Sequence, residues 1–163
     1  MKFSLVHLSG CHRGETQYFD RTWLTLGADA KNDVLFPSGD QGPVAPLHAE
    51  IFEEHCELHV RNRAAGASTL VNHQPIDKIV LRDNDLIRLG LQGPKLRIRI
   101  RPEEYAACKL VREIMQDARD IAAESDLGRG GRVGSFVAQL AYDLRRHATH
   151  TARFVIGTVF VGL

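Results

Sequence analysis

Alternation of apolar and polar residues predicts β-strands along the first part of the chain. The clearest case is residues 96–101, where leucine or isoleucine alternates with arginine at every step. Residues 57–61 alternate in the same way, with Leu58 and Val60 on one face. A period of two is the pattern of a strand with one buried face. The predicted strands are residues 3–8, 16–20, 23–26, 33–36, 48–53, 57–61, 69–71, 78–81, 85–89 and 96–101.

These elements predict a mainly β fold class. We expect about eleven strands, at the short and regular spacing that is typical of a β-sandwich. No helical period interrupts them before residue 102, so the sandwich is predicted to span residues 1–101. Gly27 lies between two of the strands and allows a tight turn there, including one with a positive φ.

The periodicity changes at Pro102 and predicts two C-terminal helices. The first has one apolar face, because its apolar residues recur in steps of four and three. These residues are Ala107, Val111, Ile114, Ala118 and Ile121. Residues 128–134 are rich in glycine and are predicted to form a flexible linker. Apolar positions between Val133 and Leu144 predict the second amphipathic helix.

The helical extension of residues 102–153 and the apolar tail of residues 154–163 leave several interpretations open. The helices could pack on the sandwich, or residues 103–150 could mediate self-association or bind a partner helix. The tail could be a buried helix end, a membrane-surface segment, or the start of a transmembrane helix that continues past Leu163. Such a helix needs about 20 apolar residues. Arg145, Arg146 and Arg153 precede the tail and would leave the sandwich on the cytoplasmic side.

Composition excludes some classes of function. The net charge is +1, which gives no bulk electrostatic case for binding nucleic acid or an anionic membrane. Arg97, Arg99 and Arg101 form a basic stripe. It could contact nucleic acid or lipid head groups, but the sequence favours a face that is solvated, paired with carboxylates, or guarding a sheet edge.

The cysteines indicate a reducing compartment. The chain has three cysteines, Cys11, Cys56 and Cys108, with no CxxC pair. This pattern favours small buried thiols over disulfides or a zinc site. The N-terminal residues contain no long apolar run, so they do not form a signal peptide. We therefore expect a cytoplasmic location, at the cytoplasmic face of the inner membrane if the tail is an anchor.

The stretch from Leu26 to Asn72 contains three loops set between short strands. Its recognisable fragments are Gly27, Asn32-Asp33-Val34, His48-Ala49 and Thr69-Leu70-Val71-Asn72, followed by the hairpin pattern of residues 81–90. In this order and spacing, the fragments resemble the forkhead-associated (FHA) domain over residues 1–101. The resemblance implies an FHA-like (SMAD/FHA) β-sandwich that binds phosphothreonine peptides through loops at one end.

The positions that contact phosphate in the FHA family are occupied by alanine here. The family's phosphate-contacting arginine falls on Ala28 and its serine on Ala45. A second loop serine or threonine falls on Ala65, and the asparagine that orients the peptide backbone falls on Ala67. A phosphate carries a charge of about −1.5 to −2 and needs charge-assisted donors, which alanine lacks. The resemblance therefore implies a degenerate phosphopeptide site.

The positions that support the loops are retained. The resemblance implies a loop-supporting role for Gly27, Asn32, His48 and Asn72. His48 also falls among the residues of the degenerate site. Displaced cations could compensate for the missing donors, and the candidates are Lys31, Arg61 and Arg63.

These features predict a protein-interaction module that is not an enzyme. No serine or cysteine nucleophile with a supporting acid is apparent beside His48. We expect a phospho-independent module with an unidentified protein partner, and neither a cofactor nor a metal. One alternative is the cytoplasmic regulatory end of a larger membrane-anchored protein, such as a protease or a secretion component. Another is a phosphothreonine-peptide binder with a rearranged site.

Overall fold

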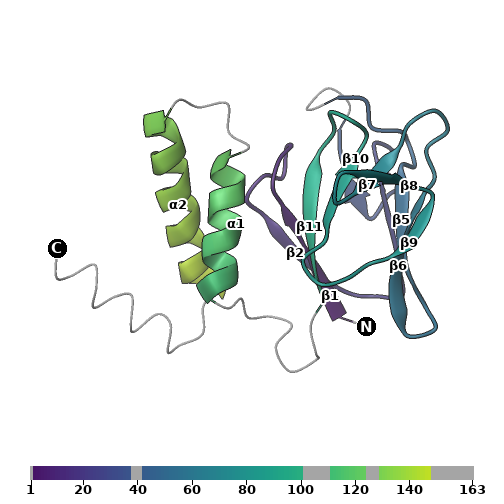
Figure 1. The fold of residues 1–163 in the computed structure, drawn as a ribbon, viewed down its shortest axis with the longest axis horizontal. Coiled ribbons are helices and arrows are strands. Elements are labelled where there is room, and N and C mark those ends of the chain that lie inside the picture. The colour runs from purple at the N-terminus through teal and green to yellow at the C-terminus, as the bar shows by residue number, and fades with distance from the viewer. Residues whose placement is uncertain (1, 38–41, 101–110, 124–128, 148–163) are drawn as a thin grey trace. The chain divides into compact units, whose positions relative to one another are not determined.

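The computed structural model describes residues 2–37, 42–100, 111–123 and 129–147, and Figure 1 draws the remaining residues as a grey trace. The chain divides into two compact units, Met1–Ala106 and Ala107–Leu163. The first unit contains all the strands and the second contains the helices. The two units are described separately below.

The first unit is a sandwich of two sheets (Figure 1). Sheet A has the strand order β2-β1-β11-β10-β7-β8, and sheet B has the order β4-β3-β5-β6-β9. The strands of sheet A are β1 (Lys2–His7), β2 (Thr16–Asp20), β7 (Thr69–Val71), β8 (Gln74–Ile76), β10 (Leu86–Leu89) and β11 (Lys95–Ile100). Those of sheet B are β3 (Trp23–Gly27), β4 (Val34–Leu35), β5 (Ala49–Glu54), β6 (Glu57–Asn62) and β9 (Lys78–Val80). The short β4 pairs in parallel with β3, whereas the other pairs are antiparallel.

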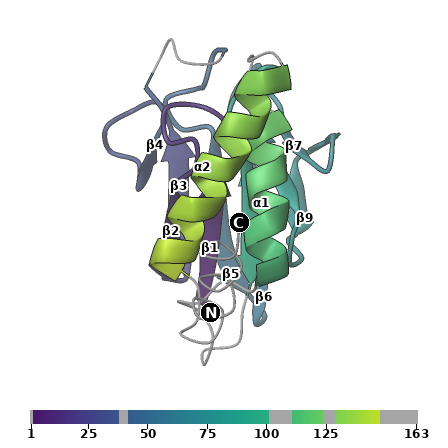
Figure 2. The same cartoon turned by 90° about the vertical axis from the view of Figure 1, so that its left-hand side faces the viewer.

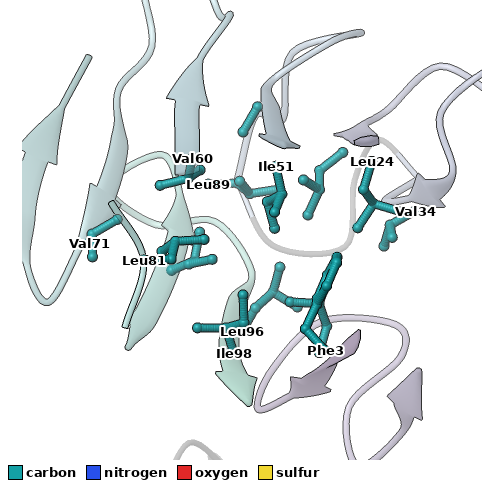
Figure 3. Close-up of a cluster of buried hydrophobic side chains, with 14 of the residues drawn as sticks. Phe3, Leu24, Val34, Ile51, Val60, Val71, Leu81, Leu89, Leu96 and Ile98 are labelled. Carbon is teal, nitrogen blue, oxygen red and sulfur yellow. The ribbon is translucent and has the colours of Figure 1, made fainter. Parts of the chain in front are cut away.

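The core lies between the two sheets, as Figure 3 shows. Alternate residues of each strand point inward, so Leu5 and Ile98 of sheet A face Ile51 and Val60 of sheet B in one cluster. All four are fully buried. Burying an aliphatic side chain of this size contributes about 1.5–3 kcal/mol relative to leaving it exposed. The alternation that predicted the strands is therefore the same pattern that builds the core.

The predicted mainly β sandwich is confirmed, and each predicted strand has a counterpart. One strand, β8, was not predicted, because its sequence contains Pro75 and follows turn residues. Proline is tolerated there since β8 is an edge strand of sheet A. The arginine stripe lies on β11, and β11 lies between β1 and β10, so the stripe does not guard a sheet edge. Arg99 donates a hydrogen bond of 2.6 Å to the Asn84 side chain.

The second unit is a pair of helices, α1 (Val111–Ala123) and α2 (Arg129–His147), which pack side by side (Figure 2). The prediction of a flexible linker over residues 128–134 is wrong for residues 129–134, because α2 begins at Arg129; residue 128 lies outside the described residues. Glycine inside a helix costs about 0.8–1.0 kcal/mol relative to alanine. The rest of α2 is long enough to form despite this cost, and α1 packs against it. The predicted start of the first helix lies at residues 102–110, outside the described residues.

Two further expectations concern the cysteines and the apolar C-terminal tail. Cys11 and Cys56 are exposed, which contradicts the prediction of buried thiols; Cys108 lies outside the described residues. Cys56 follows His55 in the turn between β5 and β6, where both residues have positive φ, and turn side chains point outward. No described helix is long and apolar enough to cross a membrane, and the predicted anchor at residues 154–163 is not among the described residues.

Candidate functional site

Three loops meet at one end of the sandwich, two within sheet B and one from β6 of sheet B to β7 of sheet A, and their backbones are hydrogen-bonded to one another. The Ala28 amide donates to the Ala45 carbonyl at 2.9 Å, and the Asp29 amide donates to the Pro46 carbonyl at 3.1 Å. The Arg63 amide donates to the His48 carbonyl at 2.8 Å. We call this end the loop rim, and it comprises residues 28–33, 42–48 and 63–68.

Gly27 allows the first two of these loops to approach closely. A Cβ atom at this position would lie 2.2 Å from the Pro46 carbonyl oxygen and 2.8 Å from the Asn32 side-chain nitrogen. A contact of this length with backbone is not tolerated, so a larger residue would push the second loop away. The φ of Gly27 is not positive, so the close approach and not the φ explains the glycine.

Asn32 and His48 join the same loops through their side chains. The Asn32 amide nitrogen donates to the Pro46 carbonyl at 2.6 Å and to the Asp29 carbonyl at 2.8 Å. The fully buried His48 accepts a hydrogen bond at Nδ1 from the Ala45 amide at 3.1 Å. Burial lowers the pKa of His48 below its ordinary value, and the nearby Ser68 backbone partly offsets this effect. The ring is therefore neutral at pH 7, as an accepting Nδ1 requires.

Asp33 fixes the end of the first loop and was not predicted as a supporting residue. Its carboxylate accepts hydrogen bonds from the Thr25 amide at 2.9 Å and the Thr25 hydroxyl at 2.8 Å. It also accepts one from Arg21 at 2.6 Å. The Thr25 amide is the main reason that the pKa of Asp33 lies below its ordinary value, with Arg21 contributing in the same direction. An ionised Asp33 thus holds the start of β4 beside β3.

Asn62 organises the third loop, and the sequence analysis missed it as well. Its amide nitrogen donates to the Ala67 carbonyl at 3.0 Å, and its carbonyl oxygen accepts from the Thr69 hydroxyl at 2.8 Å. Thr69 is fully buried, so this hydrogen bond is shielded from water. An asparagine two residues before the small-residue loop that begins at Ala64 was the available signal, because such side chains hydrogen-bond to nearby backbone groups.

Asn72 does not lie at the loop rim. It follows β7 at the end opposite Ser68, in a two-residue turn where Asn72 and His73 both have positive φ. Its amide donates to Asp85 at 2.8 Å, and its oxygen accepts from the Leu86 amide at 3.0 Å. Asn72 therefore ties the β7–β8 turn to the start of β10, a support for the other end of the sandwich.

The structure places Ala28, Ala45, Ala65 and Ala67 together in the loop rim, contributed by all three loops. Ala65 is exposed, and the other three are half-buried. None of these side chains can donate a hydrogen bond. The Ala28 amide is already engaged by Ala45. The surface that the alanines present is thus small, apolar and backed by a tightly bonded backbone.

The candidate cations are distributed differently. Lys31 is exposed in the loop rim, and its ammonium group has no ion pair with any residue that the structure describes. Arg61 and Arg63 both bind the carboxylate of Glu50, at 2.7 Å and 3.3 Å respectively. The Glu50 side chain is only 6% exposed. A buried carboxylate therefore fixes both arginines on sheet B, and neither is available to the rim without breaking that interaction.

No metal centre accompanies this site: within the described part of the chain, no group of histidine, cysteine and acidic side chains could hold an ion.

Comparisons with known proteins agree with this architecture. Residues 24–90 match the family model of the FHA domain. Among solved structures, an FHA domain described for phosphothreonine-dependent interactions is 22% identical, with a TM-score of 0.53, and the match covers 63% of this chain and 99% of that one. The FHA domain of the CT664 protein from Chlamydia trachomatis is 16% identical, with coverage of 63% and 100% and a TM-score of 0.54. An FHA domain of an Arabidopsis thaliana protein is 17% identical, with coverage of 62% and 86% and a TM-score of 0.55. No curated protein sequence matches the chain.

The sandwich therefore has the fold of these FHA domain structures. The FHA family model matches residues 24–90 of this sandwich, and a separate helical unit follows the sandwich in this chain.

Proposed function

We propose that the loop rim binds a protein partner without requiring a phosphothreonine. The observation that carries this proposal is the set of alanines at Ala28, Ala45, Ala65 and Ala67, on a rim whose supporting hydrogen bonds are intact. Hydrogen bonds to charged groups are worth about 1.5–3 kcal/mol each. A rim that lacks several such donors gains little free energy from binding a phosphate. Removing the water that hydrates the phosphate still costs free energy.

The displaced cations do not supply a replacement site. Arg61 and Arg63 are ion-paired with the buried Glu50 carboxylate. Moving either arginine to a phosphate would break that ion pair, and the free energy lost would offset the free energy gained from the phosphate. Lys31 is a single exposed ammonium on a flexible stem, and exposed ion pairs of this kind contribute about 0–1 kcal/mol. This supports recognition by shape and backbone contacts over recognition by charge at the rim.

A pull-down with the full chain tests the proposal. The chain is used to capture partners from lysate of the source cell, with and without phosphatase treatment. We expect the same partner in both samples, and calorimetry should give equal affinities for the phosphorylated and plain forms of its binding segment. Ala45→Arg, which places a bulky side chain in the rim, should abolish capture. Loss of the partner after phosphatase treatment would refute phospho-independent binding.

Restoring the donors provides a second test of the same idea. Ala28→Arg combined with Ala45→Ser and Ala67→Asn returns the side chains that the FHA resemblance places at these positions. Because the supporting bonds of Asn32, His48 and Asn62 are present, we expect this triple variant to gain measurable preference for phosphothreonine peptides. Lys31→Ala addresses the rearranged-site alternative: if the unmodified chain prefers the phosphorylated peptide and Lys31→Ala loses that preference, the alternative is correct.

A further inference from the structure

The loop between β1 and β2, residues 8–15, carries a histidine whose ring is held at both nitrogens. His12 Nδ1 lies 3.0 Å from a Glu15 carboxylate oxygen, and its Nε2 lies 3.1 Å from the Leu35 carbonyl oxygen. Leu35 belongs to β4 of the other sheet, 23 residues away in the sequence. His12 therefore connects the β1–β2 loop of sheet A to the edge strand β4 of sheet B.

Both partners of the His12 ring are hydrogen-bond acceptors. A neutral imidazole has one N–H donor, whereas the imidazolium ion has two. The ring can therefore donate to the Glu15 carboxylate and the Leu35 carbonyl together only when both of its nitrogens carry a proton. A neutral ring has to give up one bond, and it keeps the bond to the carboxylate, which is the stronger acceptor. The bond to Leu35 is lost, because a bare Nε2 and a carbonyl oxygen both present lone pairs.

A second histidine lies beside the first and is neutral. The fully buried His7 ring, at the end of β1, lies 5.2 Å from the His12 ring, measured between centroids. Burial lowers the pKa of His7 to about 4 although the Gln17 side chain opposes this, and the charge on His12 lowers it further. Two positive rings at this distance repel each other. Above about pH 4 the pair therefore takes up a single proton, and that proton is on His12.

The surroundings of His12 contain few other groups that act on its charge. Among the described residues, the titratable groups that face the ring are Glu15 in its own loop and His7 on β1. From the side of β4 it meets the Leu35 carbonyl and the Phe36 ring, whose centroid lies 6.3 Å away in an edge-to-face arrangement. The His12 side chain is 30% exposed, so its ring exchanges protons with the solvent.

We propose that His12, Glu15 and the Leu35 carbonyl form a proton-operated latch between the two sheets. With His12 charged, the latch is closed and the β1–β2 loop is tied to the end of β4. When His12 loses its proton, the latch opens at the Leu35 carbonyl and water takes the place of the ring. The latch is thus closed on the acid side and opens as the pH rises, which is the opposite sense to the acid sensitivity of His7.

The latch acts where the first loop of the rim ends. β4 is only two residues long and directly follows rim residues 28–33. Just after β4, the Phe36 amide donates to the Gly27 carbonyl at 2.9 Å. Opening the latch removes the support at the Leu35 carbonyl, so this neighbouring backbone bond should open more often. An effect on partner binding would rest on the proposed function, whereas the latch itself does not.

Nuclear magnetic resonance of the full chain, isotopically labelled on nitrogen, tests the latch without a partner. Histidine ring spectra from about pH 5 to about pH 8 cover the range in which histidine ordinarily changes charge. At the acid end, we expect both His12 nitrogens to carry protons while His7 carries one. As His12 loses its proton, the protection of the Phe36 amide against exchange, corrected for the intrinsic rate at each pH, should fall by about two- to fivefold, as expected for one partly exposed contact.

Two histidine substitutions separate the latch from general effects of pH. His12→Gln cannot change charge, so its Phe36 amide should keep the same protection over the whole pH series. His73→Asn removes an exposed histidine in the β7–β8 turn, at a positive φ that asparagine adopts readily. Its Phe36 protection should follow the pH as in the unmodified chain. Neither replaced side chain is fully buried, so both variants should fold, which circular dichroism would verify.

Three results would overturn the proposal. The first is a His12 ring with a single N–H at the acid end of the series. The second is a Phe36 protection that stays constant while His12 changes charge. The third is an equal pH dependence in His12→Gln and the unmodified chain, which would assign the change to another group. None of these measurements involves a partner, so a failure of the latch is distinguishable from a failure of the proposed rim function.

Discussion

At the scale of single residues, the loop rim is held by side chains that bond to backbone carbonyls and amides of neighbouring loops. Asn32, His48 and Asn62 each fix a loop in this way. Gly27 contributes by having no side chain, since the Pro46 carbonyl occupies the space where a Cβ would lie. These residues explain how the rim keeps its shape although several of its loop positions are alanines.

Gly27→Ala tests the close approach. The added methyl group would meet the Pro46 carbonyl at 2.2 Å, so β3 and the second loop must separate. We expect the free energy of unfolding to fall by about 1–3 kcal/mol, as for other overpacked positions. Urea unfolding of the full chain would measure it. Ala65→Ser, at an exposed position of the same rim, serves as the control and should stay within about 0.5 kcal/mol. Equal stability of Gly27→Ala and the unmodified chain would show that the two loops are not held together as described.

His7 predicts a loss of stability in mild acid. His7 is the last residue of β1, and its fully buried ring lies beside the rings of His12 and Phe36. Burial lowers the pKa of His7 from 6.5 to about 4, while the Gln17 side chain acts in the opposite direction. The unfolded chain therefore binds the proton first, so stability is constant above pH 6.5 and declines as the pH falls toward 4.

The expected decline over this whole window is about 3 kcal/mol, at 1.36 kcal/mol for each unit of pKa difference. Unfolding in urea at a series of pH values from 6.5 to 4 would measure it. His7→Gln should remove most of the slope. A smaller slope of the same sign remains, because burial also lowers the pKa of His48. An unchanged slope in His7→Gln would assign the acid sensitivity to other groups.

At the scale of elements, most of the sandwich could be predicted because each core strand repeats one physical constraint. The inward face must be apolar, and residues such as Leu58 and Val60 repeat at a period of two. Where that constraint is absent, the prediction failed. Most of β8 is exposed and contains Pro75, so no pattern marks it as a strand. Phe52 interrupts the polar face of β5 because its ring packs beside Trp23 and His59 on the outer face of sheet B instead of in the core.

The candidate site was less predictable than the strands. The alanines could be placed in the rim from sequence, since a resemblance assigns residues by order and spacing. The hydrogen bonds of Asn62 and Asp33 could not be predicted, because their partners are backbone groups whose positions depend on the folded loops. The pairing of Arg61 and Arg63 with Glu50 likewise depends on the register of β5 and β6.

A substitution in the first turns of α2 tests whether these residues form a helix or a flexible linker. Gly134 lies within α2, and a Cβ there would meet no atom within 4 Å. Gly134→Ala should therefore raise helix stability by about 1 kcal/mol, the difference in helix propensity. Far-UV circular dichroism during thermal unfolding would show the gain as increased helical signal or a later loss of it. No change would indicate that residues near Gly134 form the flexible linker that the glycines suggest.

At the scale of the whole molecule, the chain combines an FHA-like sandwich with a separate helical unit. The sandwich carries two surfaces of different chemistry. The loop rim presents four alanines, whereas the outer face of sheet B carries the neighbouring rings of Trp23, Phe52 and His59 with cationic groups over them. The first surface lies at strand ends and the second on a sheet face, so the two share none of these residues.

The sandwich should fold without the helical unit. Every member of its core cluster, from Phe3 to Ile98, comes from the first unit, and both sheets are complete within it. We expect a fragment of residues 1–106 to unfold cooperatively in urea, with an m-value of about 1–2 kcal/mol/M for its size. Its circular dichroism should show strands with little helix. A gradual, non-cooperative transition would mean that the core between the two sheets is insufficient alone.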